Sequence, residues 1–301
     1  MVNISVKKRN SCLGHSDSIY VLEQVSDDKF VSAGADGMVI LWDLRSPDEG
    51  ELIARIPGSI YALKFDQDNQ FLYVGQNNQG IHKIDLKVKK EVASVHLGSH
   101  QIFDIELVED RLWVAMETGE VAILSRDLET LSRRSYSSHR ARNIQVFRNQ
   151  VLISFSDNII REVDFKTLEI THELVGHKKS VFTSSFHPSG KYLASVSMDA
   201  HIKVWDANKN YILRESIPAH LLTINDMVFS PDGRYFATGS MDKSIKLWDA
   251  YNFKLRKVLD KQRHEGHTNS VNGLLWMKYE NLLVSCSDDK SISVWNIHFE
   301  Q

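Results

Sequence analysis

Short runs of alternating hydrophobic and polar residues follow one another along nearly the whole chain. The segment from Ser180 to Asp206, SVFTSSFHPSGKYLASVSMDAHIKVWD, is representative, with the turn-forming residues Pro188-Ser189-Gly190 separating two runs. Alternation with a period of two is typical of half-buried β-strands, and the breaks are typical of tight turns. We find no long segment with the 3.6-residue period of a helix. The pattern therefore predicts an all-β protein built from short strands.

The strand pattern itself repeats. The stretch ATGSMDKSIKLWD, Ala237 to Asp249, has counterparts at 31–43, 194–206 and 284–296. At spacings of 39 to 47 residues, the position of Trp248 is filled in chain order by Trp42, Ile84, Leu124, Val163, Trp205, Trp248 and Trp295. We expect a single domain over residues 1–301, with residues 3–12 serving the last unit and seven approximate units at 13–52, 53–92, 93–132, 133–170, 171–213, 214–256 and 257–301.

Four units carry a small residue and His near their start and Trp-Asp or Trp-Asn at their end. These frames are Gly14-His15 to Trp42-Asp43, Gly176-His177 to Trp205-Asp206, Ala219-His220 to Trp248-Asp249 and Gly266-His267 to Trp295-Asn296. A unit of about 40 to 45 residues with this frame resembles the WD-repeat β-propeller family. In units two to four the frame survives mainly as hydrophobic pattern and spacing.

The resemblance implies a seven-bladed β-propeller of four-stranded blades. Only five residues follow Asn296, too few for the outer strand of the last blade, while residues 3–12 form an orphan strand. An open sheet edge invites aggregation, so we expect the N-terminal strand to close the last blade. Cys12 and Cys286 would then lie two strands apart, about 9.6 Å, which is too far for a disulfide. We expect both thiols to be free and mostly buried.

In members of this family, each blade is held by hydrogen bonds among His, Ser or Thr, Asp and Trp. The resemblance assigns that role to four quartets: His15, Ser32, Asp36 and Trp42; His177, Ser195, Asp199 and Trp205; His220, Thr238, Asp242 and Trp248; His267, Ser285, Asp289 and Trp295. Ser, His and Asp also make up a hydrolase triad. Four equivalent copies, each tied to a Trp, favour the structural interpretation, and no G-x-S-x-G motif marks one nucleophile.

Close histidine pairs raise the alternative of a metal site. His264 and His267 lie three residues apart, and His96 and His100 lie four apart. Neither pair has the cysteine or His-Glu-x-x-His context of a zinc site. We therefore predict no metal and no cofactor.

Composition and charge narrow the function classes only slightly. Hydrophobic residues make up 42% of the chain and charged residues 25%, as in ordinary soluble proteins. The formal net charge of −3 and the lack of a recognisable motif argue against direct binding of nucleic acid, and no membrane segment is expected. The polar N-terminus and two cysteines make a cytoplasmic location the default, and we expect a monomer.

Candidate partner-binding residues come from the start of each innermost strand, which faces the channel mouth on the top face in this family. The residues after the Ser-Val pair or its equivalent are Tyr20, Tyr61, Phe103, Gln145, Phe182, Asn225 and Asn272. Those before the turn Asp or its equivalent are Ala35, Asn77, Glu117, Ser156, Met198, Met241 and Asp288. Aromatic and Met side chains at a rim suit a protein interface. Alternatively, the aromatic rings pack on one another and plug the channel.

Basic residues on the same face add a charge preference. Arg140 and Arg142 open unit four, and Lys178 and Lys179 open unit five. The long insertion before unit seven adds Lys261, Arg263 and His264. A basic arc beside an aromatic mouth would suit an acidic or phosphorylated peptide, although scattered basic residues are also common on a merely solvated face.

The hypothesis from the sequence is therefore a non-catalytic scaffold that binds a partner protein or peptide at the top face. The alternative is a propeller enzyme, a hydrolase or lyase with its site at the central channel. Such an enzyme would need convergent titratable groups at the mouth, where the aligned positions offer mostly aromatic and amide side chains. Units two to four are either a docking face or the product of drift.

Overall fold

The computed structural model describes residues 3–300, and over this range the chain forms seven four-stranded antiparallel sheets. The sheets fall into two compact structural units, each of which groups several of the sequence repeats: unit 1 comprises Met1–Arg55 and His220–Gln301, and unit 2 comprises Ile56–Ala219.

Unit 1 contains three sheets. The first comprises β2 (Ile19–Gln24), β3 (Lys29–Gly34), β4 (Met38–Asp43) and β5 (Glu51–Arg55). The second comprises β22 (Ile224–Phe229), β23 (Tyr235–Ser240), β24 (Ile245–Asp249) and β25 (Leu255–Leu259). The third has the order β26 (Val271–Trp276), β27 (Leu282–Ser287), β28 (Ser291–Glu300) and β1 (Asn3–Leu13).

Unit 2 contains four sheets of four consecutive strands. They are β6 (Ile60–Asp66), β7 (Phe71–Gln76), β8 (Gly80–Asp85) and β9 (Lys90–His96); β10 (Ile102–Val108), β11 (Arg111–Met116), β12 (Glu120–Ser125) and β13 (Thr130–Ser135); β14 (Ala141–Phe147), β15 (Gln150–Phe155), β16 (Ile159–Val163) and β17 (Ile170–Val175); β18 (Val181–Phe186), β19 (Tyr192–Ser197), β20 (His201–Asp206) and β21 (Ile212–Pro218).

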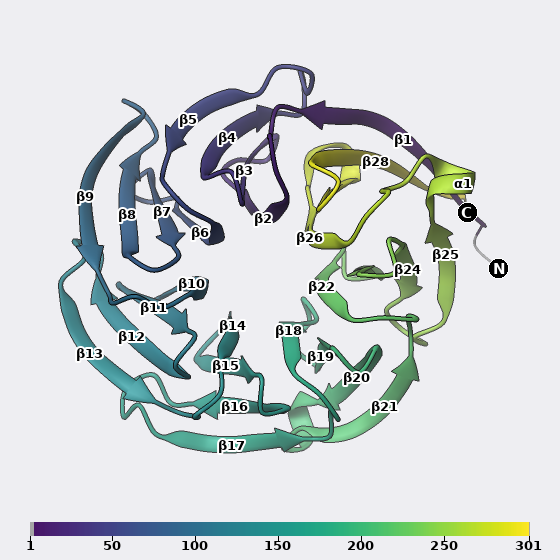
Figure 1. Cartoon of the computed structure of the whole chain (residues 1–301). Coiled ribbons are helices and arrows are strands. Elements are labelled where there is room, and N and C mark those ends of the chain that lie inside the picture. Colours follow the sequence, from purple (N-terminus) through teal and green to yellow (C-terminus); the bar gives the residue numbers. More distant parts are fainter. Residues whose placement is uncertain (1–2, 301) are drawn as a thin grey trace. The chain divides into compact units, whose positions relative to one another are not determined.

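The N-terminal strand completes the last sheet, as predicted. β1 pairs with β28, which places Cys12 opposite Ile292, and Ile292 pairs on its other side with Cys286 (Figure 1). A whole strand thus separates the two cysteines, and both are free and buried. Burial raises the pKa of Cys12 to about 12 and that of Cys286 well above its ordinary value, so both thiols stay protonated and unreactive.

The core of each unit lies between neighbouring sheets. In unit 1, Ile19 and Ile40 pack in one cluster with Val284 and Ile292 of the next sheet. In unit 2, Tyr73 packs with Leu112 and Val114 in the same way. The alternating pattern of the sequence supplies this arrangement, because every second side chain of a strand points to the same face.

Acidic and amide side chains of the first strands also fasten neighbouring sheets. In unit 1, Asp226 on β22 accepts a hydrogen bond from the Leu274 amide on β26, at 2.8 Å. In unit 2, Asp104 accepts one from the Ile144 amide at 2.7 Å. These bonds hold the starts of adjacent first strands together, which fixes the loops that begin there.

Helical structure is limited to short pieces in the part of the chain that is described. Two 3₁₀ turns cover Ala207–Lys209 and Tyr279–Asn281. One α-helical turn, α1 (Lys261–His264), lies in the insertion between β25 and β26, with Asp260 as its N-cap. Among residues 3–300, no helix is long and apolar enough to span a membrane.

Candidate functional site

The structure brings the members of each quartet together, and the sheet of β22–β25 shows how. His220 Nδ1 lies 2.9 Å from an oxygen of Asp242, and its Nε2 lies 2.8 Å from the Thr238 hydroxyl. The indole N–H of Trp248 donates to the same hydroxyl at 2.9 Å. The other three quartets repeat these contacts for His15, Ser32, Asp36 and Trp42, for His177, Ser195, Asp199 and Trp205, and for His267, Ser285, Asp289 and Trp295.

The direction of these bonds follows from the donors available. The indole N–H can only donate, so the hydroxyl accepts it and gives its own proton to His Nε2. Nδ1 then carries the proton that the carboxylate accepts, and the imidazole is neutral. Burial lowers the pKa of His15, His177 and His220, which agrees with a neutral ring.

The carboxylate of each quartet also holds two backbone segments. Asp242 accepts from the Leu221 amide at 3.1 Å and from the Ser244 amide at 3.0 Å. It therefore joins the loop before β22 to the turn between β23 and β24. Despite its partial burial, these donors and His220 hold the pKa of Asp242 well below its ordinary value.

Burial limits what the quartets can do chemically. The four histidine side chains are at most 1% exposed, and the hydroxyl residues Ser32, Ser195, Thr238 and Ser285 are fully buried. A hydrolase nucleophile must reach its substrate, whereas these hydroxyls are enclosed and bonded on both sides. The arrangement is suited to bracing a sheet.

Three sheets of unit 2 lack the quartet and replace it with apolar side chains. The hydroxyl position, identified by its pairing with the first strand, is Val74, Val114 or Ile153. The Trp position is Ile84, Leu124 or Val163. All six side chains are buried. Hydroxyl and indole have thus been replaced together, so neither group is left buried without a partner.

Local polar contacts substitute for the loop-to-turn connection in two of these sheets. In the β6–β9 sheet, the Gln76 side-chain amide donates to the Pro57 carbonyl, and Gln76 Oε1 lies 2.6 Å from His82 Nε2. In the β14–β17 sheet, Asp157 accepts from the Ser137 hydroxyl at 2.7 Å and pairs with Arg161 at 2.8 Å.

Each first strand has a register shift one residue after its start, and this residue can be compared with the one that the sequence predicts for the rim. In six sheets that residue is the one expected from the sequence: Tyr20, Tyr61, Phe103, Phe182, Asn225 and Asn272. In the β14–β17 sheet it is Arg142, so the prediction of Gln145 is wrong. The Ser156 amide donates to the Arg140 carbonyl as the Asn77 amide donates to Ser59, which aligns Arg140 with Ser59. The hydrophobic pattern of Asn143-Ile144-Gln145 imitates the start of a strand three residues too late.

The corrected position completes a stack within unit 2. The guanidinium of Arg142 lies 4.4 Å from the Phe103 ring centre and 4.8 Å from that of Phe182. The Tyr61 and Phe103 ring centres are 5.9 Å apart. Arg142 Nε donates to the Ser156 hydroxyl at 3.0 Å, which orients the planar group. Burial, with a smaller effect from Arg140, lowers the pKa of Arg142 to about 10, so it remains charged at neutral pH. We call Tyr61, Phe103, Arg142 and Phe182 the rim stack.

Other predicted partner residues lie around this stack or in unit 1. Arg140 pairs with Glu117 at 3.0 Å, and its guanidinium lies 6.0 Å from the Phe103 ring centre. Lys178 and Lys179 are exposed, and Met198 is 48% exposed, all at loop or turn positions of the β18–β21 sheet. Tyr20 and Met241 belong to unit 1, where Tyr20 is half-buried and Met241 is exposed.

In two sheets of unit 1, the same shift position holds amides that fasten the backbone. Asn225 donates to the Val271 carbonyl at 2.8 Å, and Asn272 donates to the Ile19 carbonyl at 2.9 Å and to Asp288 at 2.7 Å. The amides are therefore largely engaged within unit 1. Among the described residues, no group of three or more His, Cys, Asp or Glu side chains is arranged to hold a metal ion.

Comparisons with known proteins agree with this architecture. The family model described as "WD domain, G-beta repeat" matches residues 7–43, 168–206, 212–249 and 259–296, together about half of the chain. These segments contain the four quartets.

Individual relatives are more distant. The striatin homolog of Dictyostelium discoideum is 22% identical over 67% of this chain and 22% of its own length. WD repeat-containing protein 37 of Mus musculus is 25% identical over 95% of this chain and 49% of its own length. The chain thus spans about half or less of the length of these relatives.

A solved structure shows the same fold. The WD40 β-propeller domain of Doa1 has a TM-score of 0.85 over 97% of both chains, at 15% identity. The predicted seven-bladed fold is therefore confirmed.

Proposed function

Since the chain belongs to the WD-repeat family, we propose that it is a non-catalytic scaffold that binds a partner protein through the face carrying the rim stack. The coarser part of this proposal, an interaction role, is supported by the family. The choice of face is supported by the side chains of unit 2.

The observation that carries the proposal is Arg142 between two phenylalanine rings. Phe103, Arg142 and Phe182 are each only partly buried, so the stack keeps a surface that a partner can cover. Stacking restricts the guanidinium before a partner arrives, which reduces the entropy lost on binding. Rigid aromatic and Arg side chains are the types enriched at interface hot spots.

The electrostatics of the same face favour an acidic partner segment. Arg142, Lys178 and Lys179 add three positive charges, and Arg140 is 46% exposed although paired with Glu117. A carboxylate or phosphate group would satisfy the guanidinium in a bidentate geometry. The contact between Tyr61 and Phe103 agrees with the alternative in which the rings pack on one another, yet an arginine within the stack is costly to bury unless a partner compensates its charge.

Catalysis receives less support from the side chains of the site. The repeated His, Ser or Thr and Asp groups are enclosed and mutually bonded, and the rim positions are aromatic, amide or arginine side chains. Neither set supplies an accessible nucleophile next to a base, which is the geometry a hydrolase needs.

The test compares two arginines that each lie on a phenylalanine at opposite ends of β14. Co-purified proteins are identified from cells with the unaltered chain, and the affinity of the main partner is then measured with purified proteins. Arg142→Ala should weaken binding at least about tenfold, as expected for a hot spot. Arg148→Ala is the matched control, because Arg148 lies 5.1 Å from the Phe147 ring centre, away from the rim.

Melting temperatures of both variants show whether the fold is intact. A triple variant, Tyr20→Ala, Tyr61→Ala and Phe182→Ala, examines the aromatic contribution in the same assay. Unchanged affinity in the Arg142→Ala and triple variants, with normal melting, would place the partner site elsewhere. Turnover of a substrate that survives these changes would favour the enzyme alternative.

A further inference from the structure

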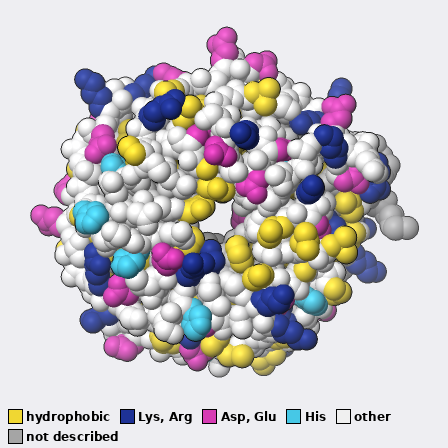
Figure 2. Space-filling view, viewed as in Figure 1, with side chains coloured by type: hydrophobic (Ala, Val, Ile, Leu, Met, Phe, Trp, Pro, Cys, Tyr) yellow, Lys and Arg dark blue, Asp and Glu magenta, His cyan; other side chains and the backbone are white. Residues whose placement is uncertain are grey.

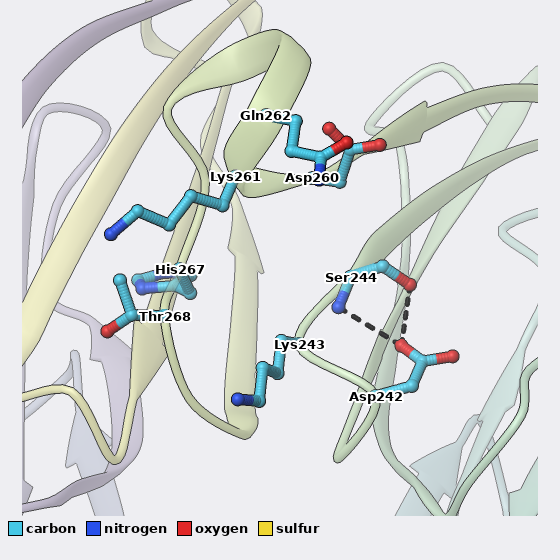
Figure 3. Close-up of a pocket in the computed structure, with 8 residues that line it drawn as sticks. All are labelled: Asp242, Lys243, Ser244, Asp260, Lys261, Gln262, His267 and Thr268. Atoms are coloured by element: carbon cyan, nitrogen blue, oxygen red, sulfur yellow. Dashed lines mark hydrogen bonds between the residues drawn. The ribbon is translucent and has the colours of Figure 1, made fainter.

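The insertion that carries α1 creates a pocket in unit 1 that the repeat does not require. The pocket has a volume of about 320 Å³ and lies between the turn joining β23 to β24 and the segment from Asp260 to Thr268 (Figure 3). We call it the α1 pocket; its lining residues are Asp242, Lys243, Ser244, Asp260, Lys261, Gln262, His267 and Thr268. This volume is sufficient for one large side chain.

The α1 pocket is lined by two aspartates and two lysines, and the lysines carry its most exposed charges. Figure 3 shows Lys243 extending from the β23–β24 turn and Lys261 from α1, both toward the side of the pocket where Thr268 lies. Both lysines are exposed, and neither ammonium group makes a hydrogen bond or ion pair with any residue in 4–298, the range whose side chains the structure describes. Lys261 also lines a second pocket, which contains Lys8, and the pKa of Lys8 is lowered by burial and, in smaller part, by Lys261.

The carboxylates of the α1 pocket are already engaged. Asp242 is bonded to His220, the Leu221 amide and Ser244, and its side chain is 9% exposed. Asp260 accepts from the backbone amide and the guanidinium of Arg263, at 2.8 and 2.6 Å. These internal bonds leave the two lysines to a negative group from outside the chain.

A group of exposed apolar side chains, which we call the apolar step, adjoins the α1 pocket. Leu221, whose amide donates to Asp242, is 88% exposed, and Leu222 and Met241 are 51% and 48% exposed. Figure 2 shows hydrophobic side chains gathered over β22 and β24, the sheet that carries these residues. The positions that follow the quartet histidine in the other three sheets are polar: Ser16-Asp17, Lys178-Lys179 and Thr268-Asn269. The sheet fold therefore does not require leucines here.

We propose that the α1 pocket and the apolar step form a second docking site, for a partner-protein segment with an aspartate or glutamate beside a large apolar side chain. The acidic side chain enters the α1 pocket between Lys243 and Lys261, and the apolar side chain covers Leu221 and Leu222. The positive charges of the two lysines specify the acidic side chain, and the adjoining apolar area specifies the large apolar side chain. This site uses residues of unit 1, and it stands whether or not the rim stack binds a partner.

We assign a carboxylate rather than a phosphate to the α1 pocket. The arginine beside this pocket, Arg263, is held by Asp260, so the pocket offers no free planar fork for bidentate recognition of a phosphate. Lysine ammonium groups act as point charges and accept a carboxylate without bidentate geometry.

A displayed library of random twelve-residue peptides, selected against the purified full chain, tests the proposal. We expect enriched peptides with Asp or Glu within two positions of Leu, Ile, Phe or Met. The binding of individual selected peptides is then measured by fluorescence anisotropy. Lys243→Gln and Lys261→Gln should each weaken binding roughly three- to fivefold and together more than about tenfold, since a partly exposed ion pair contributes up to about 1 kcal/mol.

Two control variants are matched in position or exposure. Lys290 occupies the turn position of Lys243 in the next sheet, with a similar left-handed φ of 67° against 72°, but its ammonium donates to the Ser16 carbonyl. Lys290→Gln should therefore leave peptide binding unchanged. Leu221→Ser should weaken binding about fivefold or more, the loss expected for uncovering one leucine. Tyr251→Ser should leave peptide binding unchanged. Tyr251 is 92% exposed, comparable to Leu221, but it lies at the opposite end of β24 from the α1 pocket.

The outcomes separate the alternatives. The proposal is overturned if the selected peptides lack acidic residues, or if the selected peptides bind the double lysine variant as well as the unaltered chain. Phosphoserine versions of the selected peptides are assayed in parallel. If these bind while the Asp and Glu versions do not, the assignment of a carboxylate is wrong. A normal melting temperature is required of each variant, and the double lysine variant should meet this condition because both side chains are exposed and unpaired.

Discussion

The two units stabilise their four-stranded sheets with different kinds of side chain. All three sheets of unit 1 are braced by a buried His, Ser or Thr, Asp and Trp quartet, whereas in unit 2 only the β18–β21 sheet has one, within residues 3–300. In the other three sheets of unit 2, Val or Ile replaces the hydroxyl, and Ile, Leu or Val replaces Trp. The comparison indicates that a buried polar network is kept or lost as a whole, because a partial network leaves groups desolvated and unpaired.

The register-shift residue of the first strands differs between the units in a related way. In unit 1, Asn225 and Asn272 use their amides to tie adjacent sheets. In unit 2, the shift residues are Tyr61, Phe103, Arg142 and Phe182, which stack on one another. The same backbone position thus serves cohesion in two sheets of unit 1, whose third sheet has Tyr20 there, and presents rings and charge in unit 2.

The largest effect should come from exchanging hydroxyl and methyl between the two kinds of sheet. Thr238→Val removes the hydroxyl shared by His220 and Trp248 and should cost about 3 kcal/mol of unfolding free energy. Val114→Thr places a hydroxyl in an apolar site of the β10–β13 sheet and should cost about 2 kcal/mol. Chemical denaturation measures both. If either exchange is neutral, the idea of an indivisible network is wrong.

A smaller loss is expected from removing one carboxylate. Asp242→Ala frees the loop before β22 from the β23–β24 turn and should cost about 2 kcal/mol, seen as a lower melting temperature, while the folded variant keeps its binding of a partner at the rim stack. Thr118→Ala, at the same turn position in a sheet without the quartet, should cost under about 1 kcal/mol, since its hydroxyl contacts are 3.3 and 3.4 Å long. Equal losses of unfolding free energy in the two variants would show that contacts within the turn, rather than the quartet network, account for the stabilisation.

Acid should weaken the quartets in a defined order. A histidine whose pKa is lower in the folded than in the unfolded chain binds fewer protons when folded, so its contribution is lost as the pH falls through the ordinary value of 6.5. Asp242, with its pKa also lowered, loses its contribution only as the pH falls below about 3.8. We expect the melting temperature to decline by a few degrees between pH 7 and 5. His220→Gln should flatten that decline, whereas His139→Gln, an exposed position, should not.

The smallest effect concerns the amide ties. Asn272→Ala should lower the unfolding free energy by about 1 kcal/mol, because it leaves the Ile19 carbonyl and Asp288 without that donor. The Phe103→Ala change in unit 2 should be detected mainly in partner affinity. If Asn272→Ala instead lowers the affinity for the partner and leaves the free energy of unfolding unchanged, residues of both units contribute to partner binding.

Much of this organisation could be predicted from residue types at fixed intervals. His220, Thr238, Asp242 and Trp248 recur with nearly constant spacing in four repeats, and the resemblance to the WD-repeat family assigns such a set to one hydrogen-bonded quartet in each sheet. The rim position was predictable in six sheets, because an apolar residue precedes it. It was mispredicted in the β14–β17 sheet, where Ala141 is a weak marker and Ile144 a stronger one. The α1 pocket is not predictable from the sequence: Lys261 stands out only as a basic residue of the insertion, and nothing in the sequence connects Lys243 with it.

The sequence by itself determined the number of sheets and the use of the first strand to complete the last sheet, because both depend on local alternation and repeat length. It also indicated the four quartets, through polar residues at constant intervals and the family resemblance that assigns them a role. Only the tertiary structure decided that Arg142 lies between Phe103 and Phe182, and that Lys243 and Lys261 line one pocket. These groups come from different sheets or from an insertion outside the repeat. Their distances are set by how neighbouring sheets pack, which alternation along a single strand does not encode.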